Sequence, residues 1–379
     1  MVQVRRKPSF LQTSSSSDRS NCDIPQTAMT VKIFLTGASG YIGGTALDYL
    51  HKAHPEYHCT LLVRTKQHGE VLKEKYPSAE LLYGTLEDSD RVRDAAKDAD
   101  VVVDTADSSD NVPGAVAIAK GLEEGHSAAN PGYWIHLSGT GILMWYDIAN
   151  GRGGDAPAAD QIYHDVEGVE KLFNLPEDAL HRNVDMLVQD AMSDSVRAMI
   201  LSPPTIYDTG SGAINKRSIQ IPDMVRATLR NGYAPIVGKG LTEWDNINVN
   251  DLGALYVKLV EATQDPSKNS NPDIFGRRAY FLVENGTHLW ADVAKWIADE
   301  CHRQGYLAES RTKVISQEEA GQLEGIATAS FGLNSRGVAA RAKQFLGWQP
   351  TGRALKDTIP EAVEEEARGL GLTPQYKHE

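Results

Sequence analysis

Three glycines stand at a spacing that suits the binding of a phosphate group. Gly37, Gly40 and Gly43 follow the apolar run "VKIFL" and enter the amphipathic stretch "YIGGTALDYLHKA". In a strand–turn–helix unit, glycines at these places allow a tight turn, let a pyrophosphate approach the backbone, and let the helix pack closely on the strand. A purely structural turn uses the same residue type, but here the strand, the spacing and the helix agree. The pattern therefore predicts a dinucleotide-binding loop.

The residues around this loop refine the prediction. The N–H groups of Tyr41 and Ile42 open the helix and should point at a diphosphate, to which the Ser39 hydroxyl can also donate. Arg64 ends the next apolar run, "LLVRTKQ", where an acidic residue would bind the ribose of NAD. A guanidinium instead fits a 2′-phosphate through paired hydrogen bonds. We therefore expect NADP(H) as the cofactor, and the alternative for Arg64 is an ordinary solvated arginine.

Four further residues could polarise a substrate or move a proton. Ser138 and Thr140 end the buried run "GYWIHLSGTG", and Tyr163 and His181 occur in the two segments after it. A hydroxyl can polarise a carbonyl, and a phenol or an imidazole can donate or accept a proton. A helix is expected over "EDALHRNVDMLVQDAM", which puts Asp185 one turn after His181, so its carboxylate could orient the imidazole or raise its pKa. The alternative is a plain ion pair on the helix surface.

Short apolar runs alternate with amphipathic segments along most of the chain, and this alternation positions all of these residues. It is typical of right-handed βαβ units, and hence of a parallel sheet covered by helices on both faces. The expected fold class is therefore α/β, a doubly wound parallel sheet (Rossmann) with a smaller C-terminal lobe. We expect a leader over 1–28, a dinucleotide-binding domain over 29–211 and a mainly substrate-binding lobe over 212–379, with 244–263 returning to the first domain. A stretch rich in Gly, Ala and Asp over 145–160 predicts a long mobile loop.

The leader differs from the rest of the chain in composition. Its "RRKPSFLQTSSSSDRS" is Ser-rich and lacks periodic apolar residues, which indicates disorder, although an Arg- and Ser-rich start is also typical of a mitochondrial address. A third explanation, which we favour, is an upstream start codon, because Met29 opens directly onto the first strand. The cysteines, Cys22, Cys59 and Cys301, lack metal-ligand spacing, so no metal site is predicted and the reducing cytoplasm is the expected location.

Composition and charge argue against several classes of protein. The formal net charge is −13, which disfavours a nucleic-acid partner, because binding to phosphates requires basic residues. No apolar stretch approaches the ~18 residues that a membrane span needs, so no membrane partner is expected. We expect a small-molecule substrate as the partner, bound by a monomer or a homodimer.

Five segments carry a resemblance to a known family. They are the glycine pattern, "GTLEDSDRVRDAAKDADVVVDTA", "LSPPTIYDTG", "NINVNDLGALY" and "AKQFLGWQPTGRALKDTIPEAVEE". Their order and spacing over 31–366 resemble the extended short-chain dehydrogenase/reductase superfamily, of the NAD-dependent epimerase/dehydratase kind. The resemblance implies that Leu86 borders the adenine and that Thr105 and Ala106 pass beneath the ribose and diphosphate. It also implies that Pro203 lies near the nicotinamide.

The catalytic pair of that superfamily is missing from this sequence. Its members use a tyrosine and, four residues later, a lysine, and the resemblance places Glu177 and His181 at those positions. Tyr163 comes earlier, but Glu167 stands four residues after it and Lys171 eight, so a small shift does not restore the pair. His181 could replace the lysine and hydrogen-bond the nicotinamide ribose. The "HRNVD" segment is similar to helices of fungal proteins, so the chain resembles an atypical fungal member.

These observations lead to one principal functional prediction and two alternatives. The principal prediction is an NADPH-dependent oxidoreductase of the short-chain dehydrogenase/reductase type, which transfers a hydride to a carbonyl, imine or enoyl group of a small organic metabolite. Because the catalytic pair is altered, a non-catalytic NADP-binding redox sensor is the first alternative. A redox-neutral isomerase or epimerase is the second.

Overall fold

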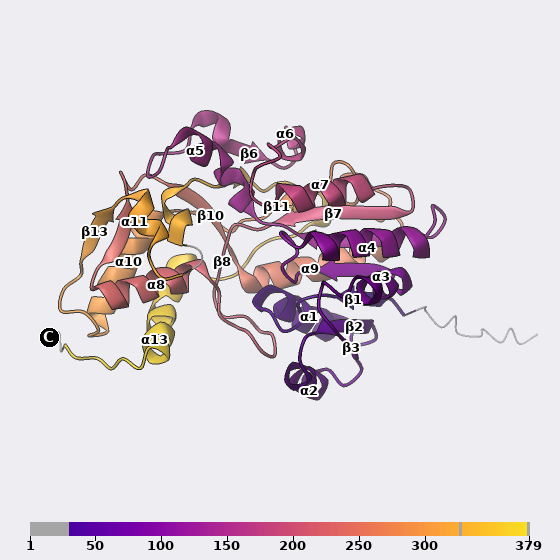
Figure 1. Cartoon of the computed structure of the whole chain (residues 1–379), viewed down its shortest axis with the longest axis horizontal. Helices are drawn as coiled ribbons and strands as arrows, with labels where there is room; N and C mark the ends of the chain where they lie inside the picture. Colours follow the sequence, from indigo (N-terminus) through magenta and orange to yellow (C-terminus); the bar gives the residue numbers. More distant parts are fainter. Residues whose placement is uncertain (1–29, 326–327, 377–379) are drawn as a thin grey trace, which may run out of the picture. The chain divides into compact units, whose positions relative to one another are not determined.

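A seven-stranded parallel sheet forms the centre of the part of the chain that the computed structural model describes, residues 30–325 and 328–376 (Figure 1). Its order is β11-β7-β5-β4-β1-β2-β3, and every neighbouring pair runs parallel. From β1 the chain adds β2 and then β3 on one side, and it then crosses to the other side of β1 to add β4. At such a reversal of strand order a ligand crevice is expected beyond the carboxyl ends of β1 and β4. The strands are β1 (Lys32–Leu35), β2 (His58–Val63), β3 (Glu80–Tyr83), β4 (Val101–Asp104), β5 (Gly132–Leu137), β7 (Val196–Ser202) and β11 (Tyr280–Leu282).

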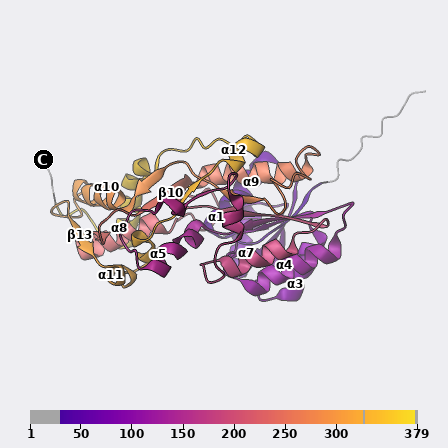
Figure 2. The same ribbon diagram turned by 90° about the horizontal axis from the view of Figure 1, so that it is seen from above.

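Helices cover both faces of this sheet. Figure 2 shows α9 on one side of it and α3, α4 and α7 on the other. α1 packs beside α9, and α3 and α7 both pack against α4. The fold is therefore the predicted doubly wound α/β sheet. These helices, with α2 after the second strand, are α1 (Tyr41–Ala53), α2 (Lys66–Lys75), α3 (Ser89–Asp98), α4 (Val112–Gly125), α7 (Arg182–Ala191) and α9 (Val249–Gln264).

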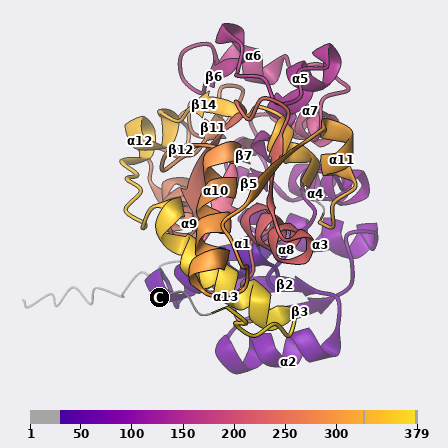
Figure 3. The ribbon, with the colours of Figure 1, turned by 90° about the vertical axis from the view of Figure 1, so that its left-hand side faces the viewer.

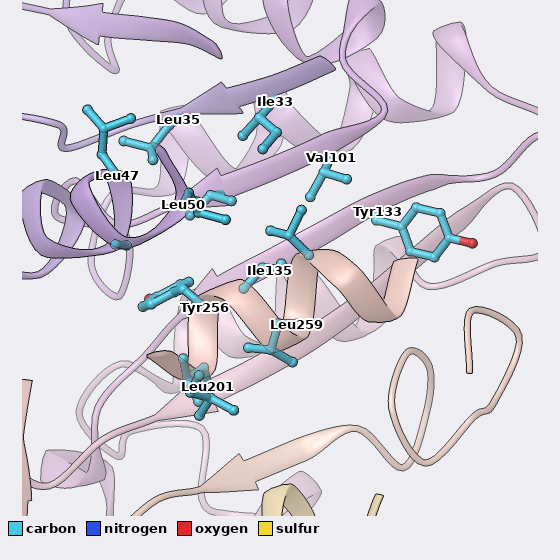
Figure 4. Packing of buried hydrophobic residues seen from close by; sticks show 14 of the residues in the cluster. Ile33, Leu35, Leu47, Leu50, Val101, Tyr133, Ile135, Leu201, Tyr256 and Leu259 are labelled. Atoms are coloured by element: carbon cyan, nitrogen blue, oxygen red, sulfur yellow. The ribbon is translucent and has the colours of Figure 1, made fainter. Parts of the chain in front are cut away.

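The alternation of side chains along each strand produces two apolar layers. Strands that are covered on both faces are apolar at nearly every position, as β4 is with its run "VVVD". Phe34, Val102, Trp134 and Ile200 face the side of α3, α4 and α7. Their neighbours along the strands face α1 and α9 (Figure 4). This second layer includes Ile33, Leu35, Val101, Ile135 and Leu201 from the sheet, Leu47 and Leu50 from α1, and Tyr256 and Leu259 from α9.

A second group of elements has its own apolar cluster. Its centre is a three-stranded sheet of order β12-β10-β8, to which two further strand pairs, β9 with β13 and β6 with β14, are added. The helices α8, α10 and α13 pack against one another beside it (Figure 3). The strands are β6 (Ile162–His164), β8 (Thr205–Tyr207), β9 (Ala234–Val237), β10 (Glu243–Asn248), β12 (Thr287–Leu289), β13 (Thr312–Ile315) and β14 (Arg336–Val338). The remaining helices of the described residues are α5 (Trp145–Asn150), α6 (Val169–Phe173), α8 (Gln220–Asn231), α10 (Trp290–Arg303), α11 (Gln317–Gly321), α12 (Arg341–Leu346) and α13 (Ile359–Gly369). Two of them pack against the main sheet instead: α6 belongs to the apolar layer of α3, α4 and α7, and α12 contacts α9 and β11.

Two sequence predictions need correction here. The stretch 145–160 is not a loop throughout, because α5 occupies its start and the buried Asp147 carboxylate fixes α5 to the backbone N–H of Asn334 (2.7 Å). The apolar run "RAMILSPPTIYD" predicts a single strand, but the structure has two strands there, β7 and β8, in different sheets. Pro203 and Pro204 separate them, since proline lacks the N–H that a strand ladder needs. The leader over 1–28, with Cys22, and Met29 lie outside the described residues.

Candidate active site

The glycine-rich turn after β1 has the shape of a phosphate cradle. Gly37 has φ +78°, a conformation that only glycine adopts without strain. A side chain on Gly43 would overlap Thr105 Oγ1 and come within 2.5 Å of the Gly37 carbonyl oxygen, so α1 can approach the end of β4 only because glycine is there. Gly40 precedes α1 and no side chain caps the helix, which leaves its first N–H groups available to an anion. The cradle therefore fits the diphosphate of a dinucleotide.

Thr36 joins this turn to the end of β4. Its hydroxyl donates to Asp104 Oδ1 (2.7 Å) and accepts from the N–H groups of Thr105 (2.9 Å) and Ala106 (3.1 Å). The Thr105 hydroxyl in turn donates to the Thr36 carbonyl (2.6 Å). Thr105 and Ala106 thus lie directly beside the glycines.

The two residues predicted to face the adenosine half lie at neighbouring strand ends. Leu86 follows β3, is buried, and contacts Gly114 at the start of α4. Arg64 comes directly after β2, its side chain is exposed, and within residues 30–325 and 328–376 it has no ion-pair partner. A free guanidinium at this edge of the sheet is available to an anionic ligand.

The segment 208–218 crosses the outer side of the cradle. The Asn215 N–H donates to the Ser39 carbonyl (3.2 Å), and the Tyr41 phenol donates to the Asp208 carbonyl (2.7 Å). Burial, reinforced by the charge of Asp208, raises the pKa of Tyr41 well above its ordinary value. Tyr41 therefore remains a neutral phenol and does not replace the missing catalytic tyrosine.

A cavity of about 320 Å³ lies beside the cradle, where the helix N-terminus meets the ends of β5 and β7. Six of the predicted residues line it: Tyr41, Ile42, Ser138, Thr140, His181 and Pro203. Tyr163 does not line it. That side chain is buried, and its hydroxyl accepts a hydrogen bond from Trp145 Nε1 (2.8 Å).

His181 is held at the cavity by a partner that the sequence did not predict. Its Nδ1 lies 2.9 Å from Asp110 Oδ1, and the hydrogen bond to His181 holds the pKa of Asp110 below its ordinary value. The Nε2 side of the ring lies against Gly139 and Gly141, next to Ser138. His181 also has φ +68°, and such strain in a residue other than glycine is most common at functional sites.

The predicted pairing of His181 with Asp185 is wrong. α7 begins at Arg182, so Glu177 and His181 precede the helix and do not share a helical face with Asp185. The Arg182 guanidinium donates to the carbonyls of Phe173 (2.7 Å) and Leu175 (3.1 Å) and thereby holds the preceding turn. The segment before Arg182 is therefore a hydrogen-bonded turn, and the helix begins about one turn later than the apolar pattern of the sequence predicted.

A buried ionic network lies behind Ser138, and sequence reasoning missed it. His136 Nδ1 is 3.4 Å from Asp104 Oδ2, and its Nε2 is 3.6 Å from Asp185 Oδ1. The Tyr280 hydroxyl donates to Asp185 Oδ2 (2.9 Å). The Ser138 hydroxyl neighbours that phenol, is itself buried, and forms no hydrogen bond of ordinary geometry within the described residues.

Burial alone would lower the pKa of His136. The hydrogen bonds and charges of Asp104 and Asp185 outweigh burial and raise this pKa to about 9. His136 is therefore an imidazolium near neutral pH. A polar residue within the apolar strand "GYWIHL" was the one available sequence signal for this network.

Neither a metal centre nor a membrane-spanning helix is found in the part of the chain that the structure describes. No group of three or more His, Cys, Asp and Glu side chains in residues 30–325 and 328–376 is arranged to hold a metal ion. In the same residues no helix is long and apolar enough to cross a bilayer.

Comparisons with known proteins agree with this geometry. A family model described as NAD(P)H-binding matches residues 37–129, which run from the cradle to the end of α4. The chain is 35% identical over 352 residues to the oxidase ucsJ of Acremonium sp, covering 91% of this chain and 100% of that protein. It is 24% identical over 335 residues to an uncharacterized protein of Schizosaccharomyces pombe, covering 86% and 97%. Both relatives are fungal, as the resemblance implied.

Solved structures with the same fold are more distant in sequence. A dTDP-glucose 4,6-dehydratase of Bacillus anthracis, in complex with NAD, aligns with TM-score 0.60 and 14% identity over 89% of this chain and 97% of its own. A UDP-glucuronic acid 4-epimerase of Bacillus cereus, in complex with UDP-glucuronic acid and NAD, aligns with TM-score 0.57 and 15% identity over 90% and 100%. Together the matches show an NAD(P)-binding fold of the oxidoreductase type, with an oxidase among its relatives.

Proposed function

The chain belongs to the extended short-chain dehydrogenase/reductase superfamily, and from that premise we propose that it is an NADP(H)-dependent oxidoreductase acting on a small organic molecule. The reacting group is a carbonyl, an imine or an enoyl group. The observation that carries this proposal is the His181–Asp110 pair, because His181 lines a cavity that the cradle residues Tyr41 and Ile42 also line. The relative named as an oxidase supports redox chemistry rather than a purely structural use of the fold.

In this proposal His181 takes over the proton transfer for which the superfamily uses tyrosine. Asp110 accepts from Nδ1 and so leaves Nε2 facing the cavity as the atom that exchanges a proton with the substrate. In the reducing direction the imidazolium gives its proton to the substrate oxygen or nitrogen, and in the oxidising direction the neutral ring removes it. The side chain is 15% exposed, so it can exchange that proton with solvent afterwards.

Two hydroxyls can hold the substrate atom that receives the proton. Ser138 lines the cavity, and its buried hydroxyl has no hydrogen-bond partner within the described residues, so in this proposal it turns toward the substrate. The Thr140 hydroxyl accepts from Ser335 (2.8 Å) and keeps its own proton for another acceptor. When bound, the nicotinamide supplies or accepts the hydride. The chain's own residues orient the acceptor and move the proton.

Cofactor preference rests on Arg64. Its guanidinium is exposed at the end of β2, and an acidic residue, which would bind an unphosphorylated ribose, does not occupy this position. The proposal therefore specifies NADP(H) rather than NAD(H).

The test combines cofactor binding with turnover in matched variants. NADPH binding to the parent is followed by nicotinamide fluorescence, and NADPH oxidation is then followed with a panel of ketones, imines and enones. We expect His181→Ala to lose ~10²- to 10⁴-fold in kcat while it keeps its affinity for NADPH. Asp110→Asn should show a smaller loss and a shifted pH profile. The control is His126→Ala. His126 is partly buried, its ring hydrogen-bonds the Leu122 carbonyl, and it does not line the cavity, so this substitution should change neither kcat nor the affinity for NADPH.

The alternative outcomes separate the other roles. Tight NADPH binding without oxidation by any member of the panel would favour the redox sensor. A loss of ~1–2 kcal/mol in NADPH binding on His181→Ala, with kcat unchanged, would identify His181 as a ribose-holding group and not as the acid.

A further inference from the structure

The only side chain with an acidic or basic group near neutral pH among the described residues that line the cavity beside the cradle is His181. Of the sixteen described residues that line it, none is Lys, Arg, Asp or Glu. From this lining we propose that the substrate is an uncharged, predominantly apolar molecule, and not a phosphorylated or carboxylated one. The inference rests on the proposed function in that it takes this cavity as the substrate site.

The inner wall of the cavity is apolar. Met144, Ile206 and Trp244 line it, and Met144 and Trp244 are buried. The indole N–H of Trp244 donates to the Leu333 carbonyl (2.7 Å), so the ring has no free donor to offer a ligand. An apolar ligand gains free energy by removing this surface from water, whereas a polar one loses hydrogen bonds to water there.

Two of the apolar side chains that line the cavity are also exposed to solvent. Leu180 precedes α7 and Ile219 precedes α8, and each is 45% exposed while lining the cavity. A nicotinamide ring would occupy part of the 320 Å³, because the cradle residues Tyr41 and Ile42 also line this space. The remainder of a substrate would then extend over Leu180 and Ile219, which we call the apolar rim.

Two arginines, one of them two residues before Ile219, are already paired with carboxylates. Arg217 binds Glu366 (2.6 Å) and Asp223 (3.1 Å), and Arg353 binds Asp208 (2.8 Å). A phosphate buried without a cationic partner costs several kcal/mol, so the cavity disfavours a nucleoside diphosphate. The names of the structural neighbours refer to nucleotide sugars, whose diphosphate the lining of this cavity does not suit.

The experiment uses the full chain and the uncharged naphthalene dye prodan as the probe. Prodan fluorescence should rise saturably on binding, both without and with NADP⁺. Leu180→Lys and Ile219→Lys place a charge on the rim and should each weaken prodan binding by at least about tenfold. Ile162→Lys is the matched control, because Ile162 is also 45% exposed but lies on β6 and does not line the cavity. UDP-glucose at millimolar concentration should neither displace the dye nor raise the melting temperature.

The remaining outcomes separate this inference from the proposed function. Displacement of prodan by UDP-glucose, or equal prodan affinity in the parent and both rim variants, would overturn the apolar substrate class. If prodan binds with the expected rim dependence but the parent does not bind NADPH, the apolar site stands and the proposed redox function fails.

Discussion

At the scale of single residues, the unusual backbone conformations gather around the cavity. Asp107, His181 and Asp208 are the residues other than glycine with positive φ in the part of the chain that the structure describes. Asp107 belongs to the turn that carries Asp110, and Asp208 accepts from the Tyr41 phenol. Each such conformation costs about 1–3 kcal/mol and persists only where surrounding contacts enforce it. Their grouping supports the assignment of the His181–Asp110 pair as functional.

Arg64 yields a prediction about cofactor choice. Arg64→Asp should reverse the preference from NADPH to NADH, by ~1–3 kcal/mol in relative binding free energy, because a charge-assisted hydrogen bond becomes a repulsion. Fluorescence titrations of both cofactors against parent and variant measure this change. If the parent binds NADPH and NADH with equal affinity, the assignment of Arg64 is wrong.

His136 yields a prediction about stability and pH. Its pKa of about 9 in the folded chain lies above the value of about 6.5 expected after unfolding. The stabilisation from its charge is therefore complete below pH ~6.5 and is lost as the pH rises through about 9. The free energy of unfolding of the parent, measured with urea from pH 6 to 9.5, should fall over this range. His136→Gln should be less stable at low pH, and its difference from the parent should shrink toward pH 9.5; a constant difference would contradict the assignment.

At the scale of elements, the meeting of α1 with the ends of β1 and β4 places the cradle beside the cavity. Gly43→Ala would insert a methyl group between the Thr105 hydroxyl and the Gly37 carbonyl. We expect a loss of ~1–3 kcal/mol in stability, the usual cost of overpacking, together with weaker NADPH binding. Urea unfolding and fluorescence titration measure the two effects.

The control for this variant is a glycine with open space around it. Apart from its chain neighbours and the backbone of its own helix, no described heavy atom lies within 4 Å of the place where a Cβ would stand at Gly321, the last residue of α11. Gly321→Ala should therefore leave cofactor binding unchanged and keep or slightly raise stability, since alanine is the better helix former. Equal effects of the two substitutions would show that the packing at Gly43 has no special role.

At the scale of the whole molecule, Val31 is the first residue of the core in the part of the chain that the structure describes. Deletion of residues 1–28 should therefore leave NADPH affinity unchanged and alter the melting temperature by less than about 2 °C, the shift that ~1 kcal/mol produces in a large domain. Differential scanning calorimetry of the full and shortened chains measures this. A fall of several degrees would show that the leader contributes to the fold.

The sequence by itself determined the sheet, its covering helices and the cradle. These follow from local rules: "VKIFL" and "VVVD" are typical of strands covered on both faces, and Gly37, Gly40 and Gly43 favour a turn between a strand and a helix. The position of Arg64 after β2 followed from the same regular alternation. Such features depend on neighbours within a few residues along the chain.

Tertiary structure decided the partners of the polar side chains. Asp110 lies 71 residues from His181 along the chain, and no periodicity connects them. Asp185 lies four residues from His181 along the chain, yet its carboxylate contacts His136 and Tyr280. The helix α7 begins only at Arg182, whose guanidinium binds two upstream carbonyls, so His181 is not on a helical face with Asp185. A buried polar group needs a hydrogen-bond partner, but that partner can come from any segment that the fold brings close. For that reason the sequence predicted which residues approach the site, and only the fold decided how they pair.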